Sequence, residues 1–282
     1  MGYFGKKPFK QPVMGSVPAF SRVISGLAKD GALPDLPQSV SWKRSVPDNG
    51  WGGLGNSPDQ QGDKPIGDCT IAAACHMIMC WSDNAQGAPW TFLAADALND
   101  FKNYKTSPDS ATLFNILNDW QAYGIHRRSG ASLVAVYIDD FALLDLNDPA
   151  QLKLQVQQSI QLLGGCYIGI ELPKFAVKNT VDDKPPLVWN KTATELDALG
   201  KDANKAPNAG HCVPAIGYDD LGIEVITWGN RTQMSWDFFD RYRDEAWAVL
   251  CKAAWMKADG TTPSGLAEDQ LAQDFNAIAN RK

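Results

Sequence analysis

One cysteine and one histidine of this chain stand where a thiol nucleophile and its base would be needed. Cys69 follows a loop rich in helix-breaking residues and precedes a run of small residues, so a helix is expected to begin at the thiol. The N–H groups and the dipole of a helix start favour thiolate over thiol. Far downstream, His211 heads a strand-like run that extends to Tyr218. This order predicts a Cys/His nucleophile pair.

Composition narrows the classes of function. The chain has 282 residues, is 44% hydrophobic and carries a net charge of −6. No Lys/Arg cluster stands out, which argues against nucleic-acid binding. No apolar run reaches the roughly 18–20 residues of a membrane span, and the first residues do not form a secretory signal. We therefore expect no membrane partner and a cytoplasmic location in the producing cell.

Six cysteines and three histidines limit the metal and redox chemistry that is available. No two cysteines form a CxxC pair, so zinc ribbons and thioredoxin-like sites are excluded. The cysteines other than Cys69 lie in apolar contexts that are typical of buried, reduced thiols. We expect neither a metal nor a cofactor.

The hydrophobic pattern predicts helices first and strands second. A polar stretch at 173–209 is expected to be a long loop, and the turn at 219–222 is expected to join two strands. The expected helices cover 69–82, 90–104, a segment capped at 109–110 that ends near 124, a crossover segment from 148 to 164, and a short segment capped at 234–237. The expected strands cover 133–138, 166–172, 211–218, 223–228 and 246–250.

This layout is typical of an α+β protein with two lobes and a cleft between them. We expect an extended N-terminal arm (1–66), a helical lobe (67–128), an antiparallel sheet lobe (129–257) and a C-terminal helical tail (258–282). Cys69 and His211 would then come from different lobes. The arm is interpreted as a propeptide that occludes the cleft, as a docking arm for a protein partner, or as both.

Several short motifs resemble those of the papain-like cysteine peptidases. The segment from His211 to Tyr218 is similar to the catalytic-histidine strand of that family. Gly67 to Thr70, Gly210 to Tyr218, Thr227 to Gly229 and Met234 to Trp236 resemble motifs in papain-like proteins of phage and bacterial genomes. The resemblance spans about residues 40–255 and implies a papain-like fold, with a helical lobe followed by an antiparallel sheet lobe.

The resemblance also implies roles for individual residues. Cys69 would attack a carbonyl carbon, and His211 would protonate the leaving amine and then activate water. The oxyanion would be held by the Cys69 N–H and by Gln61, which is further upstream than the family's glutamine. Aligned on Trp228, the position of the family's histidine-orienting asparagine is Ile226. A hairpin count instead favours Asn230, with Thr227 as the second candidate.

Two functions remain open at this stage. The first is a thiol hydrolase, either a cysteine peptidase or an amidase, that cleaves peptide or amide bonds of a peptide or protein substrate. The second is a non-catalytic structural or binding protein on a degenerate papain-like scaffold, such as a phage virion component that binds a protein partner through its N-terminal arm. The intact Cys69/His211 pair favours the first function, and the displaced supporting groups favour the second.

Overall fold

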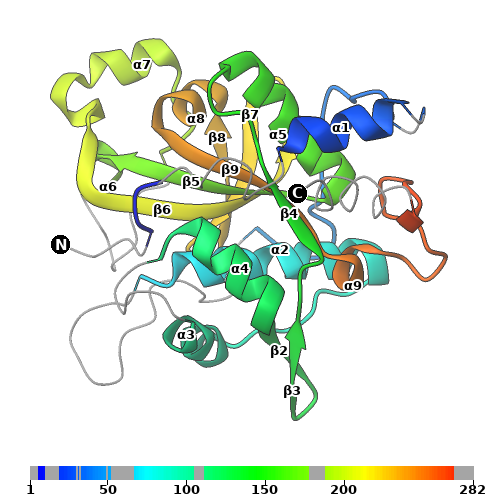
Figure 1. Cartoon of the computed structure of the whole chain (residues 1–282). Coiled ribbons are helices and arrows are strands. Elements are labelled where there is room, and N and C mark those ends of the chain that lie inside the picture. Colours follow the sequence, from blue (N-terminus) through cyan, green and yellow to red (C-terminus); the bar gives the residue numbers. More distant parts are fainter. Residues whose placement is uncertain are drawn as a thin grey trace.

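A seven-stranded antiparallel sheet separates two sets of helices (Figure 1). The computed structural model describes residues 6–9, 19–29, 31, 33–48, 50–51, 67–104, 111–177 and 188–269. The expected α+β class with an antiparallel sheet is confirmed. Among the described residues, no helix combines the length and the apolar character that crossing a bilayer requires.

The helix α2 (Cys69–Gln86) is the longest helix and lies against the strand β6. Its run of alanines has high helical propensity, and it ends where Gly87 adopts a left-handed conformation with φ 85°. On the same side lie α3 (Ala94–Asn103), α4 (Leu113–Tyr123) and the hairpin of β2 (Ile125–Ser129) and β3 (Ser132–Val136) (Figure 1).

The sheet has the strand order β4-β9-β5-β6-β7-β8, and β1 (Val40–Ser41) pairs with the far end of β6. Sequence neighbours β6, β7 and β8 form a meander, while β9 lies between β4 and β5. The strand bounds are β4 (Asp140–Leu143), β5 (Cys166–Pro173), β6 (Lys205–Tyr218), β7 (Gly222–Thr227), β8 (Asn230–Ser235) and β9 (Arg243–Leu250).

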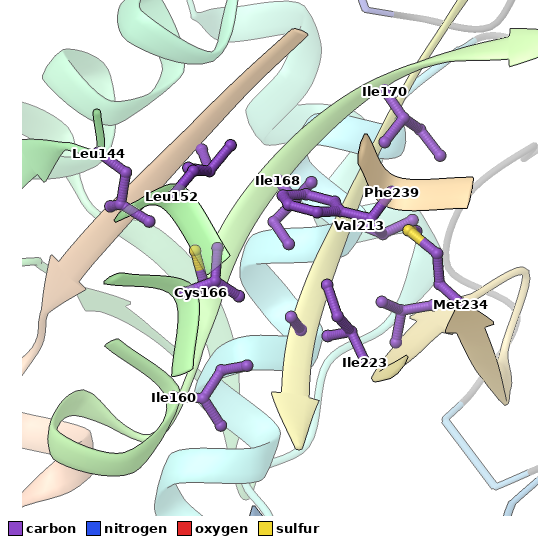
Figure 2. Packing of buried hydrophobic residues seen from close by; sticks show 14 of the residues in the cluster. Leu144, Leu152, Ile160, Cys166, Ile168, Ile170, Val213, Ile223, Met234 and Phe239 are labelled. Atoms are coloured by element: carbon purple, nitrogen blue, oxygen red, sulfur yellow. The ribbon is translucent and has the colours of Figure 1, made fainter. Parts of the chain in front are cut away.

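Side chains that alternate along the strands fill one apolar core on each face of the sheet. On β5, Ile168 and Ile170 contribute to the core shown in Figure 2, which also contains Val213 of β6, whereas Tyr167 faces the core around α2. The first core is covered by α1 (Phe20–Lys29), α5 (Pro149–Leu163) and α8 (Trp236–Tyr242). The small elements α6 (Lys174–Val177), α7 (Ala193–Ala198), the 3₁₀ turn η1 (Gly200–Ala203) and α9 (Lys252–Trp255) complete the described chain.

Some expected elements are confirmed and others are wrong. The helix from residue 69, the crossover helix and the strand at 166–172 are confirmed, and Ser235 caps α8 by accepting from the Phe238 N–H at 3.0 Å. The loop expected at 173–209 is wrong over its described part, because it contains α6, α7, η1 and the first residues of β6. The helix expected from residue 90 begins only at Ala94, because Thr91 pairs with Arg128 instead. The third helix is capped by Thr112 rather than at 109–110.

Candidate active site

Cys69 is the first residue of α2 and is buried, with 6% of its surface exposed. The first hydrogen bond within the helix runs from the Ala72 N–H to the Asp68 carbonyl at 3.0 Å. The N–H groups of the first turn therefore point towards the helix end at which the thiol lies. This position favours negative charge, as a thiolate nucleophile requires.

His211 lies in β6, and its ring is held by a hydroxyl group. Its Nε2 atom is 2.8 Å from the Thr227 Oγ1 atom, and both residues are buried. Thr227 ends β7, the strand next to β6, and a threonine hydroxyl can either accept from the ring N–H or donate to the ring nitrogen. This contact fixes the ring's orientation from the side of the sheet.

A shift in strand register explains why Thr227 reaches the histidine. Ala215 pairs with Val225, but Gly217 pairs with Glu224, so the β6–β7 ladder slips by one residue between Ala215 and Gly217. A slip of one residue exchanges the faces on which side chains lie. It places Thr227 on the same face as His211.

Two tryptophans enclose the histidine ring. Trp228 stacks on it with ring centroids 4.5 Å apart and an interplanar angle of 6°, and Trp189 meets it edge-on at 6.0 Å. Trp228 has a φ of 46°, a left-handed conformation that is costly for a bulky residue. With Gly229 it forms the two-residue turn between β7 and β8. The turn thus accepts backbone strain in a position that lays an indole flat on the histidine.

Burial sets the protonation state of this histidine. Removal from water disfavours the charged ring and lowers the pKa of His211 to about 3. In the structure as folded, the imidazole is therefore neutral at neutral pH.

The residue after the histidine connects this site to the helix that carries Cys69. Burial raises the pKa of the Cys212 thiol well above its usual range, and the charge on Cys69 raises it further. Cys69 and Cys212 belong to the same apolar core, and the Tyr167 hydroxyl donates to the Thr70 carbonyl at 2.7 Å. The start of α2 and the His211 segment of β6 are therefore close in space.

The other expected site residues have different surroundings. Asn230 is the first residue of β8, and its side chain donates from Nδ2 to the Trp228 carbonyl at 2.9 Å. Ile226 is buried in a small apolar cluster with Trp51 and Cys80. Gln61 lies outside the described residues. Among the described residues, no three His, Cys, Asp or Glu side chains are arranged to hold a metal ion.

Sequence reasoning missed Trp189. It stands in the polar stretch that was expected to be a loop, and it also stacks on Phe238 of α8 with centroids 5.7 Å apart. A lone tryptophan within a polar segment is the signal in the sequence that could have found it, because tryptophan side chains are highly buried on average.

The fold resembles that of solved cysteine proteases at low sequence identity. Xylellain, a cysteine protease from Xylella fastidiosa, superposes with a TM-score of 0.58 and 11% identity, over 89% of this chain and 97% of its own. A procathepsin B from Trypanosoma congolense gives 0.53 and 12%, over 87% and 86%.

A third such structure is the proform of the cysteine protease Amb a 11 from ragweed pollen, with a TM-score of 0.50 and 13% identity over 87% of this chain and 83% of its own. No protein-family model and no curated protein sequence matches this chain. The architecture described above, together with these superpositions, shows that the chain has a papain-like fold.

Proposed function

We propose that this protein is a thiol hydrolase that cleaves peptide or amide bonds through Cys69 and His211. The observation that supports this function best is the housing of His211 between the Thr227 hydroxyl and the flat face of Trp228. An imidazole held in one orientation, in the segment of β6 that approaches the start of α2, is the arrangement that a base serving a helix-start thiol needs.

In this mechanism His211 takes the proton from the Cys69 thiol, and the sulfur attacks the substrate carbonyl carbon. The backbone N–H of Cys69 stabilises the oxyanion, and Gln61 is the proposed second donor. The proton on His211 then passes to the leaving amine, and a thioester forms on Cys69. Water that loses its proton to His211 attacks the thioester, which releases the acid and restores the thiol.

Thr227 is the group that we propose to orient the imidazole. Asn230 is the alternative candidate for this role, although its side-chain amide donates a hydrogen bond to the Trp228 carbonyl. A hydroxyl gives the neutral ring one hydrogen bond without adding a charge.

The test is selective alkylation at pH 6, followed by mass spectrometry of all six cysteines. Cys69 should take up iodoacetamide at least tenfold faster than any other cysteine, because only the ionised sulfur reacts and burial raises the pKa of Cys166 and Cys251 to about 12. His211→Gln should abolish the advantage of Cys69. Equal labelling of Cys69 and Cys251 would contradict the hydrolase and favour the non-catalytic scaffold.

A further inference from the structure

Lys6 is a buried lysine surrounded by acidic side chains. Its side chain is fully buried, and its Nζ atom lies 2.5 Å from Asp244 Oδ2, 3.2 Å from Glu245 Oε1 and 4.0 Å from Glu171 Oε1. It also donates to the Lys7 carbonyl at 2.8 Å. A lysine is almost never buried in this way unless it is paired, so these contacts define a specific site for an ammonium group.

The sheet is shaped to make room for this side chain. A methyl group at Gly169 would collide with the Lys6 Cε atom, and it would lie 2.7 Å from Glu245 Cγ. Gly169 pairs with Glu245, whereas Ile170 pairs with Arg243, so Asp244 is the extra residue of a bulge in β9. Because of the bulge, the consecutive residues Asp244 and Glu245 both reach Lys6, as regular alternation would not allow.

The carboxyl groups around Lys6 outnumber its single ammonium group. Burial raises the pKa of Glu245 to about 7 and also raises that of Glu171. Burial lowers the pKa of Lys6, but the charges on Glu245 and Asp244 outweigh it and raise that pKa above its ordinary value. Three carboxylates around one ammonium form a pocket that prefers a cation.

This pocket lies directly beside the candidate active site. The Lys6 N–H donates to the carbonyl of Gly210, the residue before His211, at 3.2 Å. The next residue, Lys7, donates from its N–H to the Ala111 carbonyl at 2.9 Å. Ala111 precedes α4 on the helical side and Gly210 lies in the sheet, so the backbone of Lys6 and Lys7 bridges the helical side and the sheet.

We propose that Glu171, Asp244 and Glu245, built around Gly169, form a recognition pocket for the basic side chain of an extended peptide, which Lys6 of this chain fills in cis. The proposal rests on the hydrolase function above and names its substrate class: a peptide with a lysine or arginine that enters this pocket next to the reacting bond. The backbone carbonyl of Gly210 aligns the peptide, and the carboxylates select the side chain.

The experiment measures peptide binding to the full-length chain in a Cys69→Ser background, so that turnover does not consume the probe. The probe is a fluorescent, end-capped Gly-Lys-Lys-Pro-Phe peptide, compared with one that carries norleucine in place of the first lysine. The Lys6→Ala chain should bind the lysine peptide at least tenfold more tightly than the norleucine peptide. Lys7→Ala is the matched control, because it removes the same charge from the same arm and leaves the pocket filled.

Three further measurements make the outcome decisive. The Lys7→Ala chain should bind the lysine peptide at least tenfold more weakly than the Lys6→Ala chain, and Asp244→Asn in the Lys6→Ala chain should remove the preference for lysine. If Lys6→Ala does not fold, amide hydrogen exchange in the Lys6–Phe9 segment is measured instead, in a chain that retains Lys6. The lysine peptide should accelerate this exchange, and the norleucine peptide should not.

Equal binding of the two peptides, or equal acceleration of exchange by both, would overturn the pocket. Lysine-dependent binding together with an unreactive Cys69 would leave the pocket intact and overturn the hydrolase. A reactive Cys69 in a chain that does not prefer the lysine peptide would overturn the pocket and leave the hydrolase function intact.

Discussion

The hydroxyl of Thr227 is buried with the His211 ring and is 2.8 Å from its Nε2 atom. A buried polar group that loses its partner keeps its full desolvation cost, so this contact matters more than an exposed hydrogen bond would. The proposed base therefore depends on a hydroxyl to keep its ring in one orientation while Trp228 holds its plane.

Replacing that hydroxyl tests the role of Thr227. Thr227→Val should reduce the rate of Cys69 alkylation at pH 6 about tenfold, the equivalent of roughly 1.4 kcal/mol for one hydrogen bond. Thr227→Ser keeps the hydroxyl and should retain most of the rate. If Asn230→Ala slows the reaction more than Thr227→Val does, the orienting role belongs to Asn230.

At the scale of the elements, two of the helices that end in glycine, α2 and α5, do so for different reasons. Gly87 ends α2 with φ 85°, and a methyl group there would meet nothing within 4 Å. Gly164 ends α5 with φ 73°, but its methyl group would lie 2.6 Å from Trp255 and 2.7 Å from Trp81. The first position needs glycine for its backbone alone, and the second also needs it for space.

This difference predicts unequal costs for the same substitution. Gly87→Ala should lower the free energy of unfolding by about 1 kcal/mol, which is the cost of a left-handed alanine. Gly164→Ala should lower it by about 3 kcal/mol, because overpacking against two tryptophans adds to the backbone cost. Urea denaturation of both variants checks this, and equal losses would show that α5 and its neighbours move apart freely.

At the scale of the whole molecule, local signals in the sequence predicted where helices and strands form better than they predicted how the strands pair. The start of α2 and the strand β5 follow from breakers, small residues and apolar runs, and the structure confirms them. The helix α7 was missed, although Thr192 and Glu195 form a capping box that can be read from the sequence. The bulges at Asp244 and between Ala215 and Gly217 have no local signature, because they arise when strands pair.

The residues of the candidate site show the same difference between local signals and long-range contacts. Cys69 and His211 were found from their places at the starts of elements, whereas the enclosure by Trp189 depends on a contact between distant segments. Lys6 gave no signal at all, because a lysine near a chain end is ordinarily solvated. Its burial follows only from where two strands, β5 and β9, bring their three carboxylates.

The stability of the folded chain should also report on a second buried histidine. His76 lies on α2, its Nε2 atom is 2.9 Å from the Trp51 carbonyl, and burial lowers its pKa to about 4. Because the unfolded chain binds a proton there near pH 6.5 and the folded chain does not, stability is lost as the pH falls from 6.5 towards 4. This single group contributes a slope of about 1.4 kcal/mol per pH unit.

His76→Gln should remove that slope, since glutamine can donate to the Trp51 carbonyl but does not titrate. Urea denaturation at pH 7, 6 and 5 gives the free energy of unfolding of both chains. Between pH 6 and pH 5, the value for the variant should rise relative to that of the unsubstituted chain by about 1 kcal/mol or more. Glu245 acts in the opposite direction between about pH 4.5 and 7, because burial raises its pKa, but its contribution is common to the two chains and cancels in the difference. Parallel stability curves for the two chains would mean that His76 is protonated in the folded state, and that the pairing of α2 with Trp51 tolerates a charge.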